Sequence, residues 1–158
     1  MNIFKHLHFS NPTTEQTHVL KAMEDFVSSE NQYDFMVLCG AAGTGKTSIT
    51  AALIGYLNEL GKPYKISAPT GRAARILGRK AKTTTSTIHS MIYAPKADNE
   101  TGKVTFKLKL GYNANITVYI IDEASMIPKD IDKGQNLFQV EKGLIYDLIA
   151  YIKKANVN

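Results

Sequence analysis

The sequence predicts an α/β domain with a parallel sheet, and two features of the chain lead to this prediction. Short apolar runs that suit buried strands alternate with segments whose apolar residues recur at helical spacing. A glycine-rich stretch also joins the first of these runs to a helical segment. Strands that alternate with helices are typical of parallel sheets. The 158 residues are enough for one such domain with its own hydrophobic core.

The helical segments are expected at residues 13–29, 46–60, 71–79, 86–93 and 142–155. The first of them has the clearest start signal. Thr13 can cap it, and Gln16 stands three residues later, as a capping box requires. Residues 1–12 before it read as an irregular lead-in, and residues 13–158 as the domain itself.

Strands are expected at residues 35–39, 64–68 and 117–121. The first is a continuous apolar run, which suits a strand buried on both faces of a parallel sheet. Residues 103–109 instead alternate polar and apolar side chains, and turn-forming residues precede them at 98–102. This pattern predicts a small β-hairpin inserted in the domain.

Composition favours a cytoplasmic protein. Hydrophobic residues make up 44% and charged residues 21% of the chain, as in ordinary globular proteins. No apolar run approaches the roughly 18 residues that cross a bilayer, and residues 1–9 lack the apolar core of a signal peptide. The single cysteine, Cys39, excludes an internal disulfide and is interpreted as a small buried residue.

The positive charge is concentrated in one part of the chain. Between Arg72 and Lys109 there are nine basic and two acidic residues, a local charge of +7, whereas the rest of the chain carries −2. Such an excess suits a polyanion such as nucleic acid. A solvated face that aids solubility is an equally good interpretation of charge alone.

Residues 40–47, Gly-Ala-Ala-Gly-Thr-Gly-Lys-Thr, fit the phosphate-binding (Walker A) pattern at every fixed position. Its glycines let backbone N–H groups surround anionic oxygens, and the following helix adds its dipole. Lys46 is expected to reach the β- and γ-phosphates of ATP, and Thr47 to hold Mg²⁺. The expected nucleotide contacts are Gly40, Ala41, Ala42, Gly43, Thr44, Gly45, Lys46, Thr47 and Ser48.

Two carboxylates follow the third apolar strand. Asp122 is expected to hold Mg²⁺, and Glu123 to orient and deprotonate the attacking water. Acids after an apolar run are a weak signal by themselves, because acids often begin helices. With a phosphate-binding loop upstream, they indicate an ATPase centre in which Lys46 and Glu123 are the catalytic residues.

The order of the motifs resembles superfamily 1 DNA helicases of the RecD and Dda type. The matching stretches are residues 40–47, Ala68-Pro69-Thr70-Gly71-Arg72-Ala73-Ala74, Thr87-Ile88-His89 and Asp122-Glu123-Ala124-Ser125-Met126. They correspond to motifs I, Ia, Ib and II of the first RecA-like motor domain. The resemblance implies ATP hydrolysis coupled to 5′–3′ movement on single-stranded DNA and to unwinding. DNA repair, recombination and replication all stay open as the pathway.

The resemblance also implies roles for single residues. Gln16 matches the glutamine that reads the adenine edge, although it could serve only in the helix cap. Thr70 matches a contact to the DNA backbone. Arg72 and Arg75 lie close by in the sequence, either as added positive charge or as members of surface ion pairs. His89 matches the motif Ib histidine near the DNA.

Residues 94–115 fall where this family inserts a hairpin, the pin, that separates the strands. Phe106 stands in the middle of the expected hairpin strand among lysines. It is interpreted either as a base-stacking residue at the separation point or as a residue that packs the hairpin onto the domain.

The sequence departs from this family after motif II, where a further strand and a second motor domain are expected. The domain is therefore interpreted as truncated, and the chain alone as a weak or inactive ATPase that lacks its C-terminal partner. Two other functions stay open: another P-loop enzyme such as a small-molecule kinase, and a nucleic-acid-binding module that binds ATP without turnover. DNA-stimulated hydrolysis separates the helicase from both.

Overall fold

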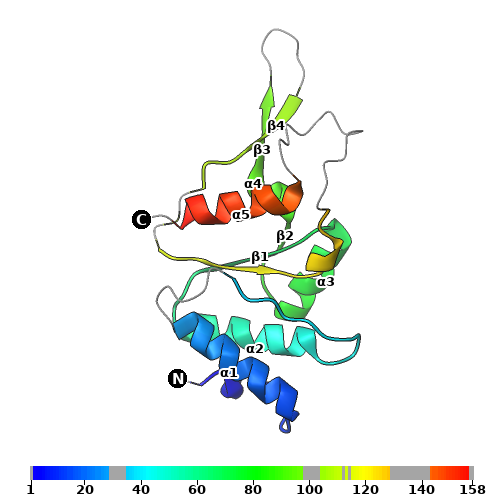
Figure 1. The fold of residues 1–158 in the computed structure, drawn as a ribbon, viewed down its shortest axis with the longest axis vertical. Helices are drawn as coiled ribbons and strands as arrows, with labels where there is room; N and C mark the ends of the chain where they lie inside the picture. Colours follow the sequence, from blue (N-terminus) through cyan, green and yellow to red (C-terminus); the bar gives the residue numbers. More distant parts are fainter. Residues whose placement is uncertain are drawn as a thin grey trace. The chain divides into compact units, whose positions relative to one another are not determined.

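A computed structural model describes residues 2–28, 35–97, 104–111, 113, 115–128 and 143–156 (Figure 1). The chain forms two compact units, Met1–Lys62 and Pro63–Asn158. Each unit is described by itself below. Within the described residues, no helix has both the length and the apolar character that crossing a bilayer requires.

The first unit contains the helices α1 (Thr14–Ser28) and α2 (Lys46–Glu59) and the short 3-10 helix η1 (Ile3–His6). Apolar side chains of α1 and α2 form its core: Leu20, Met23, Val27, Ile49, Leu53 and Leu57. Ile3 of η1 is fully buried, and His6 Nε2 lies 2.8 Å from Glu59 Oε2 on α2. The prediction of an irregular lead-in was therefore wrong for residues 3–6, because this single turn buries an apolar side chain.

The predicted capping box at the start of α1 is confirmed. The Gln16 N–H donates to Thr13 Oγ1 at 3.2 Å, and the Thr13 N–H donates to Gln16 Oε1 at 3.0 Å. Two backbone donors that the helix itself leaves without acceptors are thereby satisfied.

The predicted strand at residues 35–39 is not present. Residues 35–40 have no regular secondary structure, Phe35 is 74% exposed and Val37 is 68% exposed. Cys39 is exposed as well, not buried as expected. An extended segment becomes a strand only when neighbouring backbones pair with it. An apolar run in the sequence does not show whether such a neighbour is in place.

A three-stranded parallel sheet forms the centre of the second unit, which confirms the predicted fold class. Strand β1 (Tyr64–Ala68) lies between β2 (Ser86–Thr87) and β5 (Val118–Ile121). All residues of β5 are half-buried, so this strand is less buried than expected. Ala68 pairs with Thr87, so β1 and β2 end at the same edge of the sheet.

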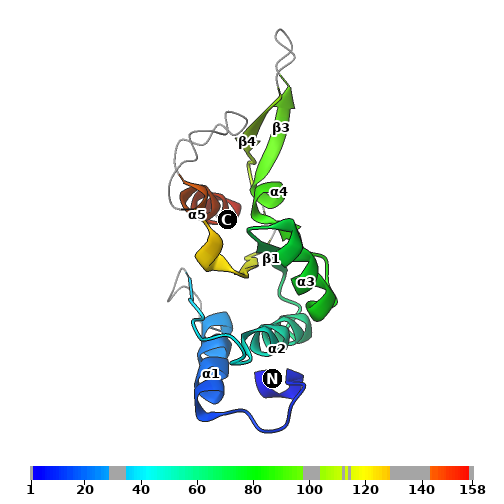
Figure 2. The ribbon, with the colours of Figure 1, turned by 90° about the vertical axis from the view of Figure 1, so that its right-hand side faces the viewer.

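The helices α3 (Gly71–Ala81) and α5 (Leu144–Ala155) lie on either side of β1 (Figure 2). The helix predicted at residues 86–93 is shorter than expected. Its first two residues pair with β1 as β2, and only Ile88–Ile92 form the helix α4. Thr87 sets this boundary, because its extended backbone ends the strand while its side chain caps α4.

The predicted hairpin is confirmed. Strands β3 (Tyr93–Ala97) and β4 (Val104–Leu108) pair antiparallel, with Pro95 opposite Phe106. The predicted turn at 98–102 lies outside the described residues. The hairpin follows α4 directly, and α4 and α5 share the core of this unit, which includes Ile88, Ile92, Tyr93, Leu144, Leu148 and Tyr151. The core therefore fixes the base of the hairpin.

Candidate nucleotide and nucleic-acid sites

The phosphate-binding loop has the backbone geometry that its glycines allow. Gly43 and Gly45 have φ angles of +81° and +87°, in the left-handed region that other residues rarely adopt. Helix α2 begins directly after Gly45, and no side chain caps its start. The first N–H groups of an uncapped helix point outward and attract anions. The residues present therefore fit a phosphate group.

Lys46 lies along the same loop. Its Nζ donates to the Gly40 carbonyl at 2.7 Å and to the Ala41 carbonyl at 2.8 Å. The Thr44 hydroxyl also donates to Ala41 O, at 2.9 Å, and so closes a tight turn. These contacts hold the ammonium group beside the loop, where it can exchange carbonyl oxygens for phosphate oxygens.

Gln16 contacts the loop as well as capping α1. Its Nε2 donates to the Thr44 carbonyl at 3.1 Å, while its Oε1 serves in the capping box. The two atoms of one amide thus connect the start of α1 to the phosphate-binding loop. The cap interpretation of Gln16 is confirmed, and its contact with adenine stays a prediction.

The carboxylate pair stands at the carboxyl end of β5. The Asp122 N–H donates to Ser67 O at 3.0 Å, and Asp122 Oδ1 accepts the Glu123 N–H at 3.0 Å. Glu123 is exposed and has a φ of +52°, a costly backbone conformation for a residue with a side chain. Thr47 belongs to the first unit and Asp122 to the second. Among the described residues, no three His, Cys, Asp or Glu side chains gather as a metal cluster.

Motifs Ia and Ib begin at the same sheet edge, at the last residues of β1 and β2. Each contains a threonine that caps a helix: Thr70 Oγ1 accepts the Ala73 N–H at 3.2 Å, and Thr87 Oγ1 accepts the Ser90 N–H at 3.1 Å. The Thr70 hydroxyl can therefore still donate its own hydrogen to a ligand. Arg72 follows on the exposed side of α3.

A pocket of about 430 Å³ lies at the base of the hairpin and brings two predicted DNA-binding residues together. Its lining comes from β2, α4 and both hairpin strands: Thr87, His89, Ser90, Tyr93, Pro95, Phe106 and Lys109. The rings of His89 and Tyr93 have centroids 5.8 Å apart. Phe106 is half-buried and also packs against the core, so both earlier interpretations of this residue remain compatible with the structure.

Burial controls the charge in this pocket. It lowers the pKa of the His89 imidazole below its ordinary value of 6.5, which keeps the ring mostly neutral at pH 7. The positive charge comes from Lys109, whose Nζ donates to Ser90 O at 2.7 Å and to Met91 O at 3.2 Å. These bonds satisfy the last carbonyls of α4 and fix the lysine at the pocket wall.

Two comparisons bear on the family of this chain. Residues 13–139 match the AAA domain family, which is most of the chain. The chain belongs to the AAA domain family. It is also 36% identical over 93 residues to the ATP-dependent RecD2 DNA helicase of Deinococcus radiodurans. That match covers 58% of this chain and 12% of the relative, so the chain spans a small part of that protein's length. Together the matches confirm the resemblance to superfamily 1 helicases of the RecD type.

Sequence reasoning missed one polar contact of this AAA domain. The Tyr93 hydroxyl donates to Asp147 Oδ2 at 2.6 Å and thereby connects the base of the hairpin to α5. The two residues are 54 positions apart, and neither belongs to a motif. The only local signal was a tyrosine at the end of a helical pattern, which does not identify its partner.

We expect Tyr93→Phe to destabilise the AAA domain by about 1 to 3 kcal/mol, since the Asp147 carboxylate then loses a buried donor. Burial and this bond raise the pKa of Tyr93 well above its ordinary value of 10.0. Above pH 10 the folded state therefore keeps the proton of the Tyr93 hydroxyl, whereas the unfolded state releases it. The free energy of unfolding consequently falls as the pH rises. Urea denaturation from pH 7 to 11 should show a smaller alkaline loss in Tyr93→Phe. Tyr146→Phe, on an exposed tyrosine of α5, is the control.

Proposed function

We propose that this chain supplies the ATP-binding part of an ATP-dependent DNA helicase. Hydrolysis would be coupled to 5′–3′ movement on single-stranded DNA and to duplex unwinding. The observation that carries the proposal is the pocket in which His89 of motif Ib and Phe106 of the hairpin meet. A phosphate-binding loop in the same chain and the similarity to a named DNA helicase support it.

On the nucleotide side, the N–H groups at the start of α2 and the loop Gly40–Ser48 would bind the phosphates of ATP, and Gln16 would contact the adenine. Lys46 would neutralise charge on the β- and γ-phosphates. The Thr47 hydroxyl and the Asp122 carboxylate are oxygen ligands of the kind that Mg²⁺ prefers. When bound, Mg²⁺ supplies positive charge that stabilises phosphoryl transfer. Glu123 would accept a proton from the attacking water.

On the DNA side, Thr70 and Arg72 would contact the phosphate backbone at the edge of the sheet. His89 and Phe106 would hold an unstacked base, because aromatic rings stack on bases of any sequence. A neutral His89 suits this role, since a neutral ring stacks without the cost of desolvating a charge.

The Phe106 side chain allows stacking to be separated from packing. Phe106→Leu keeps most of the apolar volume that packs against the core but removes the aromatic face. We expect it to weaken single-stranded DNA binding about tenfold with little change in stability. Val104→Ala, on an exposed position of the same strand, should leave binding unchanged. Normal unwinding and ATPase in a Phe106→Ala helicase would remove the stacking role.

The proposal is tested by measuring ATP binding and hydrolysis with and without single-stranded DNA. We expect the chain to bind Mg²⁺–ATP, Lys46→Ala to abolish this binding, and DNA to stimulate turnover. If turnover needs the C-terminal motor sequence, joining that sequence should restore it. Phosphate transfer to a small molecule would indicate a kinase instead. DNA binding that persists in Lys46→Ala without any turnover, even in the joined protein, would indicate a binding module.

A further inference from the structure

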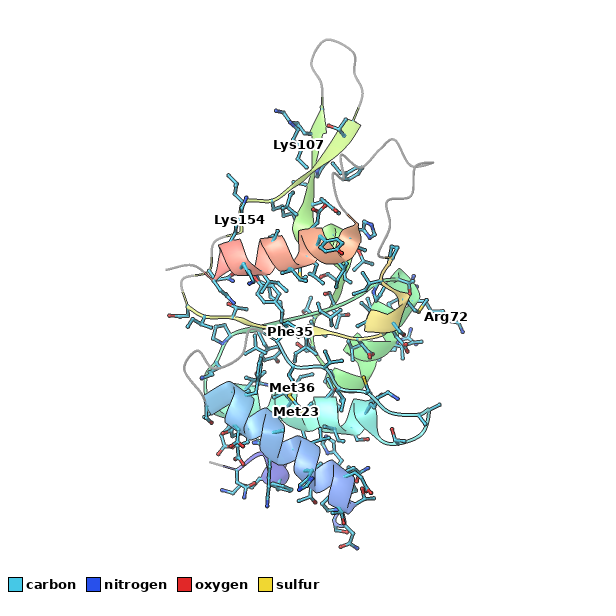
Figure 3. All side chains as sticks on the ribbon, in the orientation of Figure 1. Met23, Phe35, Met36, Arg72, Lys107 and Lys154 are labelled. Atoms are coloured by element: carbon cyan, nitrogen blue, oxygen red, sulfur yellow. The ribbon has the colours of Figure 1, made fainter. Side chains whose placement is uncertain are left out.

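Helix α3 carries a row of three exposed arginines. Arg72, Arg75 and Arg79 are spaced three and four residues apart, so they lie on one side of the helix. Figure 3 shows the labelled Arg72 side chain extending away from α3. We call Arg72, Arg75 and Arg79 the arginine stripe. It spans the eight residues from Arg72 to Arg79, about 10 Å along a helix axis.

No acidic side chain neutralises the stripe within the described residues. The 38 residues between Glu59 and Asp98 contain no acid and eight basic residues. The ion pair that the structure shows in its described part, His6–Glu59, involves none of the three arginines. The described acids in this unit are Asp122, Glu123 and Asp147. Asp147 accepts from Tyr93, Asp122 accepts the Glu123 N–H, and none of the three forms an ion pair with the stripe. Among the residues that the structure describes, the stripe is therefore a positively charged surface without an acidic partner, which suits a polyanion.

The opposite side of α3 is fixed. The Thr85 hydroxyl donates to Ala74 O at 2.6 Å, and the Thr83 N–H donates to Gly78 O at 3.2 Å. Gly78 permits this approach, because a Cβ there would stand 2.7 Å from Thr85 Oγ1. The helix thus presents the stripe from a rigid support, which lowers the entropy lost on binding.

The stripe begins beside the aromatic pocket. A Cβ built on Gly71, the first residue of α3, would stand 4.0 Å from Thr87 Cγ2, and Thr87 lines the pocket. Thr87 therefore lies close to the start of α3 and also lines the pocket, and Arg72, the first arginine of the stripe, directly follows Gly71.

We propose that the arginine stripe binds the phosphate backbone of the single strand whose base enters the pocket, so that the contact continues from Thr70 and Arg72 to Arg75 and Arg79. The inference rests on the proposed function and extends it. Arginine suits this role because its planar group binds phosphate oxygens in pairs. The ligand is a single strand, since a base can enter an aromatic pocket only when it is unpaired.

The test compares two double variants with the same charge change. Arg75→Gln/Arg79→Gln alters the stripe, and Lys153→Gln/Lys154→Gln alters two exposed lysines of α5. Binding of a fluorescent oligothymidylate is measured over a range of salt concentrations. For single strands, each lost phosphate contact lowers the slope of log K against log salt by about 0.7. We expect the stripe variant to lose about 1.4 in slope and about tenfold or more in affinity, and the control to change little.

Circular dichroism confirms that each variant is folded, and Arg75→Lys/Arg79→Lys should keep the slope while losing part of the affinity. The inference is overturned if the stripe variant keeps the wild-type slope, or if both double variants lose slope equally. It is also overturned if duplex binding falls while oligothymidylate binding does not. In each of these three cases, DNA binding by the wild-type chain would still support the proposed function. A wild-type chain that binds no DNA would overturn both.

Discussion

Gly45→Ala should lower the affinity of the chain for Mg²⁺–ATP at least a hundredfold. Gly45 has a φ of +87°, and a Cβ there would stand 2.8 Å from Gln16 Nε2. A left-handed alanine costs about 1 to 2 kcal/mol by itself. In addition, the end of the Gln16 side chain has to move, which breaks its bond to the Thr44 carbonyl of the loop. Both effects displace the N–H groups that would surround the phosphates.

Substitutions at two other glycines separate the backbone strain from the clash with the Gln16 side chain. Gly43 and Gly61 also have positive φ angles, +81° and +63°, but nothing lies within 4 Å of a Cβ at either position. Gly43→Ala adds backbone strain inside the loop without the clash, so its loss of affinity should be smaller. Gly61→Ala should cost about 1 to 2 kcal/mol of stability and leave ATP binding unchanged. Titration calorimetry and urea denaturation measure the two quantities. If Gly45→Ala binds ATP as Gly61→Ala does, the loop is not the nucleotide site.

The sequence predicted those elements whose signals are local. The capping box at Thr13 and Gln16, the loop before α2 and the strand at residues 64–68 were each predicted from nearby residues, and all three are present. The expected strand at residues 35–39 was wrong because a strand also needs a neighbour, which local apolar content does not report. The boundary between β2 and α4 was missed for the same reason, since pairing with β1 extends Ser86 and Thr87.

The candidate site also contains features with a local sequence signal and features that depend on distant residues. The phosphate loop and the carboxylates are contiguous motifs, so their residues were found from the sequence. The pocket was not found, because it joins His89 of α4 to Phe106 of β4 across the hairpin. The excess of positive charge between Arg72 and Lys109 was visible in the sequence. It could be interpreted either as a solvated face or as a binding surface. The rigid support of α3 and its approach to Thr87 now favour binding.

The backbone of Glu123 gives a second reason to place catalysis at this residue. Its φ of +52° costs free energy that glycine or asparagine would avoid, and no described side-chain bond at the start of η2 (Ala124–Met126) requires a glutamate. Residues that hold such conformations are concentrated at functional sites. If only the turn mattered, glycine would stabilise this position. The retained glutamate therefore suggests a role for its carboxylate.

We expect Glu123→Gln to lower the rate of DNA-stimulated ATP hydrolysis about a hundredfold or more, with Mg²⁺–ATP binding retained. A general base contributes roughly 10² to 10⁴ to a rate, and an amide cannot accept the proton from water. Glu123→Gly is the matched variant. It should raise stability by relieving the φ of +52°, yet lose hydrolysis as completely as Glu123→Gln. Hydrolysis is measured in the form that hydrolyses ATP, either the chain alone or the chain joined to the C-terminal motor sequence. Stability is measured by urea denaturation. Hydrolysis that survives in both variants would assign the base to another residue and leave the strain at Glu123 a feature of the turn alone.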